Sequence, residues 1–263
     1  MLLKTDINIT IDNIKINFDT EGLWVLNIAL AVIMFGVALS IKLTDFKRLL
    51  QKPKLLLVGV FSQFFLLPAL TFVAILIIKP HPSFALGMMM IAACPGGNVS
   101  NFFSKMAKGN AALSVSLTAF ATVICLVMTP FNLQFYGGLY EPTNAILKTV
   151  ELNPFELFKL VLLILGIPII LGMTLNHYFE NIAKKIEALL KPFSMIVFLA
   201  LISIAFYENI EIFLEHIHLV AALVIFHNIG AYIIGFYTAK GFRLDKRDQK
   251  TISMETGIQN GGL

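Results

Sequence analysis

The residue with the most informative chemistry is an acid inside an apolar stretch. Glu255 follows Lys250 and begins a segment that stays apolar and glycine-rich to Leu263, whereas the other acidic residues fall in predicted loops or at the ends of predicted helices. A charged side chain within hydrocarbon costs about 2.5–3.5 kcal/mol or more, so it needs a partner or a function. Its position alone leaves two readings open: an interfacial carboxylate paired with Lys250 or Arg247, or a buried carboxylate in a binding site.

Two polar, glycine-rich stretches interrupt apolar segments, one in the first half of the chain and one at its end. They read Cys-Pro-Gly-Gly-Asn-Val-Ser-Asn over residues 94–101 and Glu-Thr-Gly-Ile-Gln-Asn-Gly-Gly over residues 255–262. Proline removes a hydrogen-bond donor and glycine loosens a helix, so we expect both stretches to unwind. Paired interrupted helices indicate a transporter's binding site, because unwound backbone at membrane depth must line a cavity or be buried in protein. Small-residue helix packing is the alternative for either stretch taken singly, but the density of Asn, Gln, Ser and Glu in both favours a site.

Further oxygen-bearing side chains come from neighbouring predicted helices. Ser114 and Thr118 are four residues apart and therefore share one helical face, and Gln63 lies in another apolar segment. With Glu255 and Gln259 they make a set of neutral oxygens around a single carboxylate. Hard cations prefer oxygen ligands, and the single charge of sodium balances a single carboxylate. These residues therefore predict a sodium site rather than a zinc site built from His and Cys.

The composition requires a membrane around these residues. Of the 263 residues, 57% are hydrophobic and 14% are charged, and the mean hydropathy is +0.82, whereas soluble domains are about 45–50% apolar and about 25% charged. These values exclude a soluble globular fold, and the scattered basic residues form no nucleic-acid-binding face. Since a spanning helix needs about 20 apolar residues, we predict an all-α polytopic membrane protein. Its spans, about eight with the last one truncated, are Trp24–Ile41, Leu55–Ile78, Phe84–Phe103, Ala111–Tyr136, Leu157–His177, Phe193–Phe206, Phe213–Ala239 and a segment from Thr251 to Leu263.

The distribution of Lys and Arg predicts an orientation. Basic residues gather after the first, third, fifth and seventh predicted spans and are sparse in the other connections. The positive-inside rule therefore places those loops in the cytoplasm and the N-terminus outside. Residues 1–22 lack the layout of a cleavable signal peptide. We predict an extracellular or periplasmic segment over residues 1–22 and a transmembrane domain over residues 23–263, in the plasma membrane or bacterial inner membrane.

The order and spacing of several motifs resemble the bile acid:sodium symporter family. The resemblance runs from about Trp24 to the last residue and rests on six stretches: Gln63–Pro68, Cys94–Asn101, Ala107–Asn110, Ala112–Ser116, Phe226–Asn228 and Glu255–Asn260. It implies a core domain and a panel domain built from inverted repeats, with two crossed broken helices. The start of the chain resembles the nine-span members. Because the family continues through the last broken helix and one more span, the resemblance also implies that the chain is C-terminally incomplete.

The resemblance further implies two sodium sites and a place for the substrate, with sodium as the coupling ion and no other cofactor. One sodium ion would be held by Ser100, Asn101, Ser114, Thr118 and Glu255. The other would be held by Gln63, Glu255 and Gln259, together with backbone carbonyls near Thr256 and Ile258. The family's substrates are organic anions, either bile-acid-like steroids or small carboxylates. Asn98 and Asn260, at the tips of the broken helices, would receive the anionic group.

Taken together, the residues and the resemblance predict sodium-coupled uptake of an organic anion by alternating access. One alternative is a proton-coupled efflux transporter of a related fold, against which the neutral oxygens around Glu255 argue. Another is a non-transporting membrane sensor or fragment. An enzyme is not expected, because the sequence offers no nucleophile–base pair or phosphate-cradling loop. The expected partners are the anion, sodium ions and the lipid bilayer, and His227 is expected to make an interhelical hydrogen bond rather than carry a proton.

Overall fold

Helices make up nearly all of the regular structure in the computed structural model, which describes residues 20–149, 159 and 162–260. The predicted all-α class is therefore confirmed for the described residues. The helices and two π-helical turns are α2 (Thr20–Ala38), α3 (Leu43–Leu50), α4 (Pro53–Phe61), η1 (Ser62–Leu66), α5 (Leu67–Ile78), α6 (Pro82–Ala93), α7 (Asn98–Met106), α8 (Ala111–Leu139), α9 (Glu141–Thr149), η2 (Leu162–Gly166), α11 (Ile167–Tyr178), α12 (Glu180–Glu208), α13 (Ile210–Gly241) and α14 (Lys246–Gly257).

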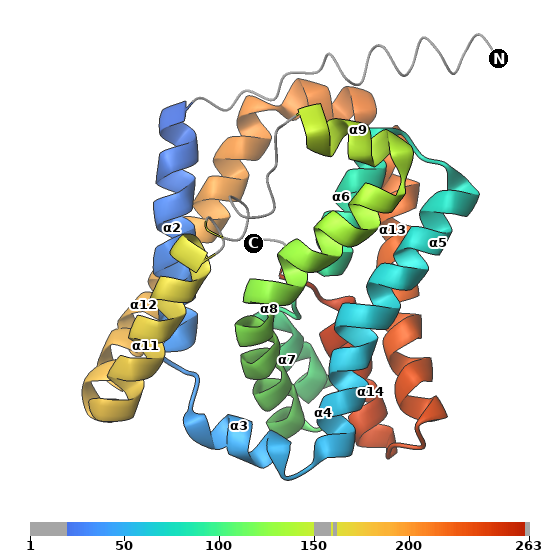
Figure 1. The fold of residues 1–263 in the computed structure, drawn as a ribbon. Coiled ribbons are helices and arrows are strands. Elements are labelled where there is room, and N and C mark those ends of the chain that lie inside the picture. The colour runs from blue at the N-terminus through green and yellow to red at the C-terminus, as the bar shows by residue number, and fades with distance from the viewer. Residues whose placement is uncertain (1–19, 150–158, 160–161, 261–263) are drawn as a thin grey trace, which may run out of the picture.

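The helices form two groups that lie side by side (Figure 1). In the first group, on the left of the figure, α2, α11 and α12 pack on one another, while α4 to α8, α13 and α14 pack together in the second. The short helix α3 runs between the groups at one end of the molecule. A cluster of buried apolar residues joins them, in which Met34 and Ala38 of α2 and Ile169 of α11 pack with Phe64 and Cys125.

Three helical segments in the described ranges are long and apolar enough to cross a bilayer. They are Pro53–Ile78, Ala111–Leu139 and Val220–Gly241, and Pro82–Ala93 is a shorter apolar helix. The three match the second, fourth and seventh predicted spans. The third predicted span is broken after α6, and the first and sixth fall largely within α2 and α12. The fifth and eighth predicted spans extend into residues that lie outside the described ranges.

Helix α2 is described from Thr20 onward, so it includes the last residues of the predicted N-terminal segment 1–22. Residues 1–19 lie outside the part of the chain that the structure describes.

The second predicted span contains a widened turn. α4 and α5 are joined by η1, which is followed directly by Leu67 and Pro68. Proline lacks the N–H that an α-helix needs and crowds the preceding turn, so the turn before it widens. Ser62, Gln63 and Phe64 are consecutive in sequence and yet all fully buried. The wide turn therefore aims three neighbouring side chains into the protein.

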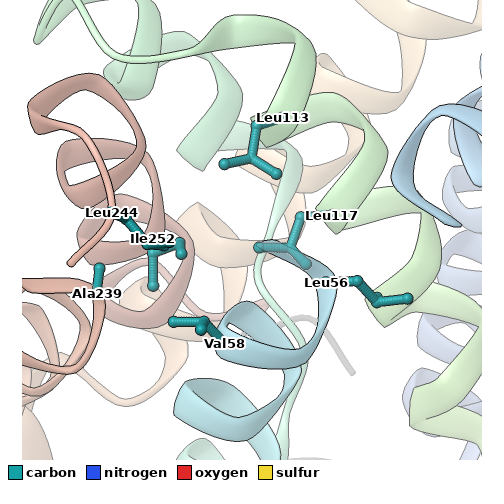
Figure 2. Packing of buried hydrophobic residues seen from close by; sticks show 7 residues of the cluster. All are labelled: Leu56, Val58, Leu113, Leu117, Ala239, Leu244 and Ile252. Atoms are coloured by element: carbon teal, nitrogen blue, oxygen red, sulfur yellow. The ribbon is translucent and has the colours of Figure 1, made fainter. Parts of the chain in front are cut away.

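Buried apolar side chains fix α14 against its neighbours. Figure 2 shows this cluster, which consists of Leu56, Val58, Leu113, Leu117, Ala239, Leu244 and Ile252. It joins α4, α8, the end of α13 and α14. Ile252 anchors one face of α14, and the adjoining face, which carries Thr251 and Glu255, is turned toward α7 and α8. The apolar cluster thus sets the orientation of the polar face.

Candidate functional site

Two helices break where the sequence predicts, and their unwound segments lie against each other. α6 ends at Ala93, residues 94–97 are non-helical, and α7 begins at Asn98; α14 ends at Gly257. Pro95 accounts for the first break, because it cannot donate to the helix and it biases the residue before it toward extended backbone. The amide of Gly97 donates to the carbonyl of Ile258 at 2.9 Å, and the amide of Asn260 donates to the carbonyl of Pro95 at 2.8 Å. Gly96 and Gln259 form an antiparallel bridge at this crossing.

Glu255 sits beside the crossing with no exposed surface. Its Oε1 accepts hydrogen bonds from the hydroxyls of Ser100, at 2.6 Å, and of Ser114. Its Oε2 accepts from the Thr118 hydroxyl at 2.7 Å, and this hydroxyl also lies 3.2 Å from Oδ1 of Asn101. The structure therefore brings all five residues of the first predicted set together, from α7, α8 and α14.

Arg247 and Lys250 do not pair with this carboxylate. Lys250 donates to the carbonyl of Ala107 at 2.9 Å, and Arg247 lies 3.4 Å from the carbonyl of Gly109. The interfacial reading of Glu255 is therefore wrong, and hydroxyl groups satisfy the acid in place of a cationic side chain.

The second predicted set also converges on the crossing. Gln63, in η1, donates from Nε2 to the backbone carbonyl of Glu255 at 2.7 Å. Gln259 donates from Nε2 to the backbone carbonyl of Thr256 at 2.6 Å. Ile258 contributes the carbonyl that meets the amide of Gly97. The backbone carbonyls near Thr256 and Ile258 therefore lie in the unwound part of the chain, as predicted.

Two amide oxygens at this place have no hydrogen-bond partner in the part of the chain that the structure describes. Oε1 of Gln63 and Oε1 of Gln259 are both buried and accept no hydrogen bond from the described residues. An unsatisfied buried acceptor costs about 1–3 kcal/mol, so two of them together are unusual in a stable interior. Neutral oxygens next to a carboxylate are suitable ligands for a hard cation. The donor set therefore fits sodium at both predicted sites.

The two predicted substrate contacts flank the crossing. Asn98 is the first residue of α7, and its side chain lies outside what the structure describes. Asn260 follows the end of α14, with its Cα 3.4 Å from the place that a Cβ on Gly97 would take. The N-terminus of α7 thus opens at the crossing, where its free N–H groups carry a partial positive charge.

His227 lies apart from this site. Its Nε2 is 2.9 Å from the hydroxyl of Thr71, which links α13 to α5. The predicted interhelical hydrogen bond is confirmed.

A comparison with protein families decides what kind of protein carries this site. The model of the sodium bile acid symporter family matches residues 27–216, which is more than half of the chain. The chain belongs to the sodium bile acid symporter family. It is therefore a multi-pass membrane protein of a family of sodium-dependent transporters, not of enzymes.

Curated relatives of this symporter family cover most of the chain. An uncharacterized sodium-dependent transporter, YocS, of Bacillus subtilis (strain 168) is 34% identical over 90% of this chain and 71% of its own length. The human ileal sodium/bile acid cotransporter is 27% identical over 91% of this chain and 67% of its own length. The probable sodium/metabolite cotransporter BASS1, chloroplastic, of Arabidopsis thaliana is 28% identical over 90% of this chain, and the match spans 57% of its own length. The chain thus spans little more than half the length of the plant protein.

This family member also has contacts around the site that the sequence analysis missed. The hydroxyl of Ser62 lies 2.9 Å from that of Thr256, so η1 holds α14 at two neighbouring positions. Ser62 and Gln63 are adjacent in sequence, and the wide turn of η1 lets both side chains reach α14. The residue spacing of a regular helix does not predict this arrangement. Asp248 and Thr251 were also missed, although their spacing of three and four residues along the helix that carries Glu255 could have revealed them.

Proposed function

We propose that the chain provides the ion-binding part of a sodium-coupled symporter that takes up an organic anion by alternating access. The observation that carries the proposal is the full burial of Glu255 at the crossing of two broken helices, beside two amide oxygens without partners. A buried acid held by neutral hydroxyls keeps a negative charge available for a cation. The crossing makes that cation-binding place depend on both broken helices at once.

The first sodium site would use side chains that already lie in contact with one another in this structure. Ser100, Ser114 and Thr118 donate their hydrogens to Glu255, and a hydroxyl that donates keeps its lone pairs for a cation. Oδ1 of Asn101 adds a fourth neutral oxygen. Sodium bound there would be surrounded by oxygens from α7, α8 and α14, and its charge would be balanced by one carboxylate.

The second sodium site would satisfy the atoms that now lack partners. Oε1 of Gln63 and Oε1 of Gln259 would become ligands, with Glu255 and the backbone carbonyls near Thr256 and Ile258 completing the set. Glu255 would serve both sites. Because η1, the first break and the second break all contribute, sodium would tie together the segments that form the substrate's surroundings.

The anion would bind beside these ions. The N-terminus of α7 offers free N–H groups and a partial positive charge, which is how half-helices meet anionic groups in transporters. Asn98 and Asn260 flank that place. The ileal relative is named for bile acids and the plant relative for a metabolite, so the substrate class is a bile-acid-like steroid or a small carboxylate.

Transport would follow from movement between the two helix groups. We assign α2, α11 and α12 to the panel domain and the group that carries the breaks to the core domain, with the halves related as inverted repeats. The panel would rock against the core and turn the site from the outside toward the cytoplasm. The N-terminus would face outside and residues 23–263 would lie in the cell membrane, as the basic loops indicate.

Uptake by the purified protein in proteoliposomes tests this function. A panel of labelled steroid and carboxylate anions should accumulate when sodium is outside and should not accumulate when choline replaces it. Glu255→Ala should abolish sodium coupling, whereas Asn8→Ala, in the N-terminal segment, should leave it intact. Equal uptake in choline, or full transport by a folded Glu255→Ala protein, would contradict the proposal. Uptake or release driven by a pH jump alone would favour the proton-coupled alternative.

A further inference from the structure

Helix α7 turns its hydroxyl groups inward and its apolar side chains outward. Among its described side chains only Ser100 and Ser104 are buried. Phe102 and Met106 are exposed by 61% and 63%, as suits side chains that meet lipid. Ser100 and Ser104 are four residues apart and so share one face. Because the Ser100 hydroxyl reaches Glu255, the Ser104 hydroxyl lies one helical turn farther along the same inward face.

The two helices packed against α7 carry matching polar stripes. On α14, Asp248, Thr251 and Glu255 recur at intervals of three and four residues and are all buried. At the start of α8, polar residues recur every four positions, at Asn110, Ser114 and Thr118. Polar residues that recur about once per turn on each of three packed helices form a file, that is, a row of oxygen atoms between the helices. Positions four residues apart on one helix are about 6 Å apart along its axis.

Hydrogen bonds satisfy the two ends of this file. At one end, hydroxyls from α7 and α8 hold Glu255. At the other end, Nδ2 of Asn110 donates to Oδ1 of Asp248 at 2.8 Å, and the amide of Asn110 donates to the Thr251 hydroxyl at 2.8 Å. Asp248 lies in the first turn of α14 and is 6% exposed, so a second, buried carboxylate lies beyond the predicted sodium ligands.

The middle of the file contains an unsatisfied group. Ser104 has no exposed surface, and its hydroxyl has no hydrogen-bond partner among the described residues. A Cβ built on Gly109 would lie 2.7 Å from the Thr251 hydroxyl and 2.9 Å from the Ser104 carbonyl. The Ser104 backbone carbonyl and the Thr251 hydroxyl therefore approach each other closely at Gly109, where a larger residue would not fit. The Ser104 hydroxyl, buried and without a partner among the described residues, lies one helical turn from the serine that reaches Glu255, and its oxygen can serve as a cation ligand.

We propose that this file is the route by which sodium leaves the Glu255 site toward the cytoplasm, with the hydroxyls of Ser104 and Thr251 as transient ligands and Asp248 at the exit. The proposal rests on the proposed function and on the orientation that goes with it. An ion cannot cross hydrocarbon without a large cost, so its departure needs oxygens at successive steps. Arg247 and Lys250 hold the turn after α7 against α14, and these contacts close the exit in this structure.

Silver accessibility of single cysteines tests the route without knowledge of the substrate. Silver is a monovalent cation that reacts with thiols, and blocked thiols are counted by later maleimide labelling of the denatured protein. The experiment uses inside-out membrane vesicles in nitrate salts that contain the Ser104→Cys or the Thr251→Cys variant. Phe103→Cys is the matched control, because Phe103 is next to Ser104 on α7 and its side chain is exposed. The parent chain, with its two buried cysteines Cys94 and Cys125, gives the background.

Silver from the cytoplasmic side should block Ser104→Cys and Thr251→Cys at least about tenfold faster than Phe103→Cys, because the control thiol borders hydrocarbon that excludes ions. Replacing choline with sodium should slow both reactions severalfold by competition. If silver blocks the thiols of the folded variants no faster than that of the control, or if sodium does not change the rate, the route is wrong. Contact with buried water would then account for the Ser104 hydroxyl. The two positions lie on different helices, so a folding failure at one leaves the other as the test.

A parallel melting measurement separates this inference from the proposed function. If sodium fails to raise the melting temperature of the parent chain relative to choline, the proposed function fails together with the route. If sodium stabilises the parent, and that stabilisation is lost in Glu255→Gln, a negative silver result overturns the route alone.

Discussion

At the scale of single residues, the site contains a carboxylate with three hydroxyl partners and two amide oxygens that have no partner among the described residues. Glu255 could be buried with a cationic side chain, but the nearby Arg247 and Lys250 bond to backbone carbonyls instead. Hydroxyl donors stabilise the charge and still leave lone pairs free. The unsatisfied oxygens of Gln63 and Gln259 then cost free energy unless a ligand contacts them. This combination is typical of a site that binds and releases a cation.

Gln259→Ala tests the role of an unsatisfied oxygen. The substitution should raise the sodium concentration needed for half-maximal thermal stabilisation about tenfold, which corresponds to about 1.4 kcal/mol. Melting temperatures of the purified protein across a sodium titration measure it. Gln249→Ala is the matched control, since Gln249 bonds to the carbonyl of Leu244 near the start of α14. An unchanged sodium response in Gln259→Ala would remove this residue from the site.

Most of the site's residues could be predicted from types and spacing. Ser114 and Thr118 share a helix face, and proline and glycine predicted that the stretches carrying Ser100 and Glu255 would unwind and form a site. The contact of Ser62 with Thr256 could not, because it depends on the wide turn of η1. The lack of a hydrogen-bond partner for the Ser104 hydroxyl among the described residues could not be predicted either. A sequence does not show which buried polar groups remain without a partner.

At the scale of elements, the two breaks must approach each other very closely. Gly96 lies where a Cβ would come within 2.7 Å of Nε2 of Gln63 and 2.8 Å of the Glu255 carbonyl. Only glycine fits there without displacing backbone. The sequence predicted that these stretches unwind, because proline and glycine have local effects. The antiparallel pairing of Gly96 with Gln259 is a long-range contact, and only its inverted arrangement could be anticipated.

We therefore expect Gly96→Ala to disrupt the site by displacing the backbone where the two broken helices cross. Forcing a methyl into this contact should cost about 1–3 kcal/mol of stability and should abolish the sodium-dependent rise in melting temperature. Gly87→Ala is the control, because Gly87 lies within α6 with nothing within 4 Å of its added Cβ, and alanine there should be neutral or stabilising by about 0.5–1 kcal/mol. If both variants behave alike, the close crossing is not needed for sodium binding.

The packing of α13 on α14 gives a second test at this scale. A Cβ on Gly235 would meet the carbonyl of Ile252 at 2.7 Å and Cβ of Thr256 at 2.9 Å, whereas Gly230 on the same helix has open space. Gly235→Ala should lower the melting temperature and weaken sodium stabilisation by shifting α14, and Gly230→Ala should do neither. Equal melting curves for the two variants would show that α14 tolerates the shift.

At the scale of the whole molecule, the site lies within one of two helix groups, and its side-chain contacts come from η1, α7, α8 and α14. The sequence predicted the all-α class and the membrane from composition, and helices match the second, fourth and seventh predicted spans in length and hydropathy. It also predicted eight continuous or broken spans from apolar runs. The sequence did not predict that α2, α11 and α12 group together, because uniformly apolar helices carry little pattern that identifies their packing partners.

Charge movement is the prediction at this scale. If two sodium ions accompany one monovalent anion, each cycle carries one positive charge inward, and an inside-negative potential of 100 mV contributes about 2.3 kcal/mol. This corresponds to about 50-fold greater accumulation of the anion at equilibrium. A potassium diffusion potential set with valinomycin in proteoliposomes provides the measurement. Accumulation that does not respond to the potential would contradict the two-to-one stoichiometry.

Equilibrium binding of radioactive sodium to the purified protein tests the central claim most directly. The parent chain should bind it saturably, with displacement by unlabelled sodium and not by choline. Glu255→Gln should fold, as judged by its melting curve, and should lose this binding, because the charge at the crossing of the broken helices is removed. Saturable binding of the same affinity and amount in Glu255→Gln would contradict the account.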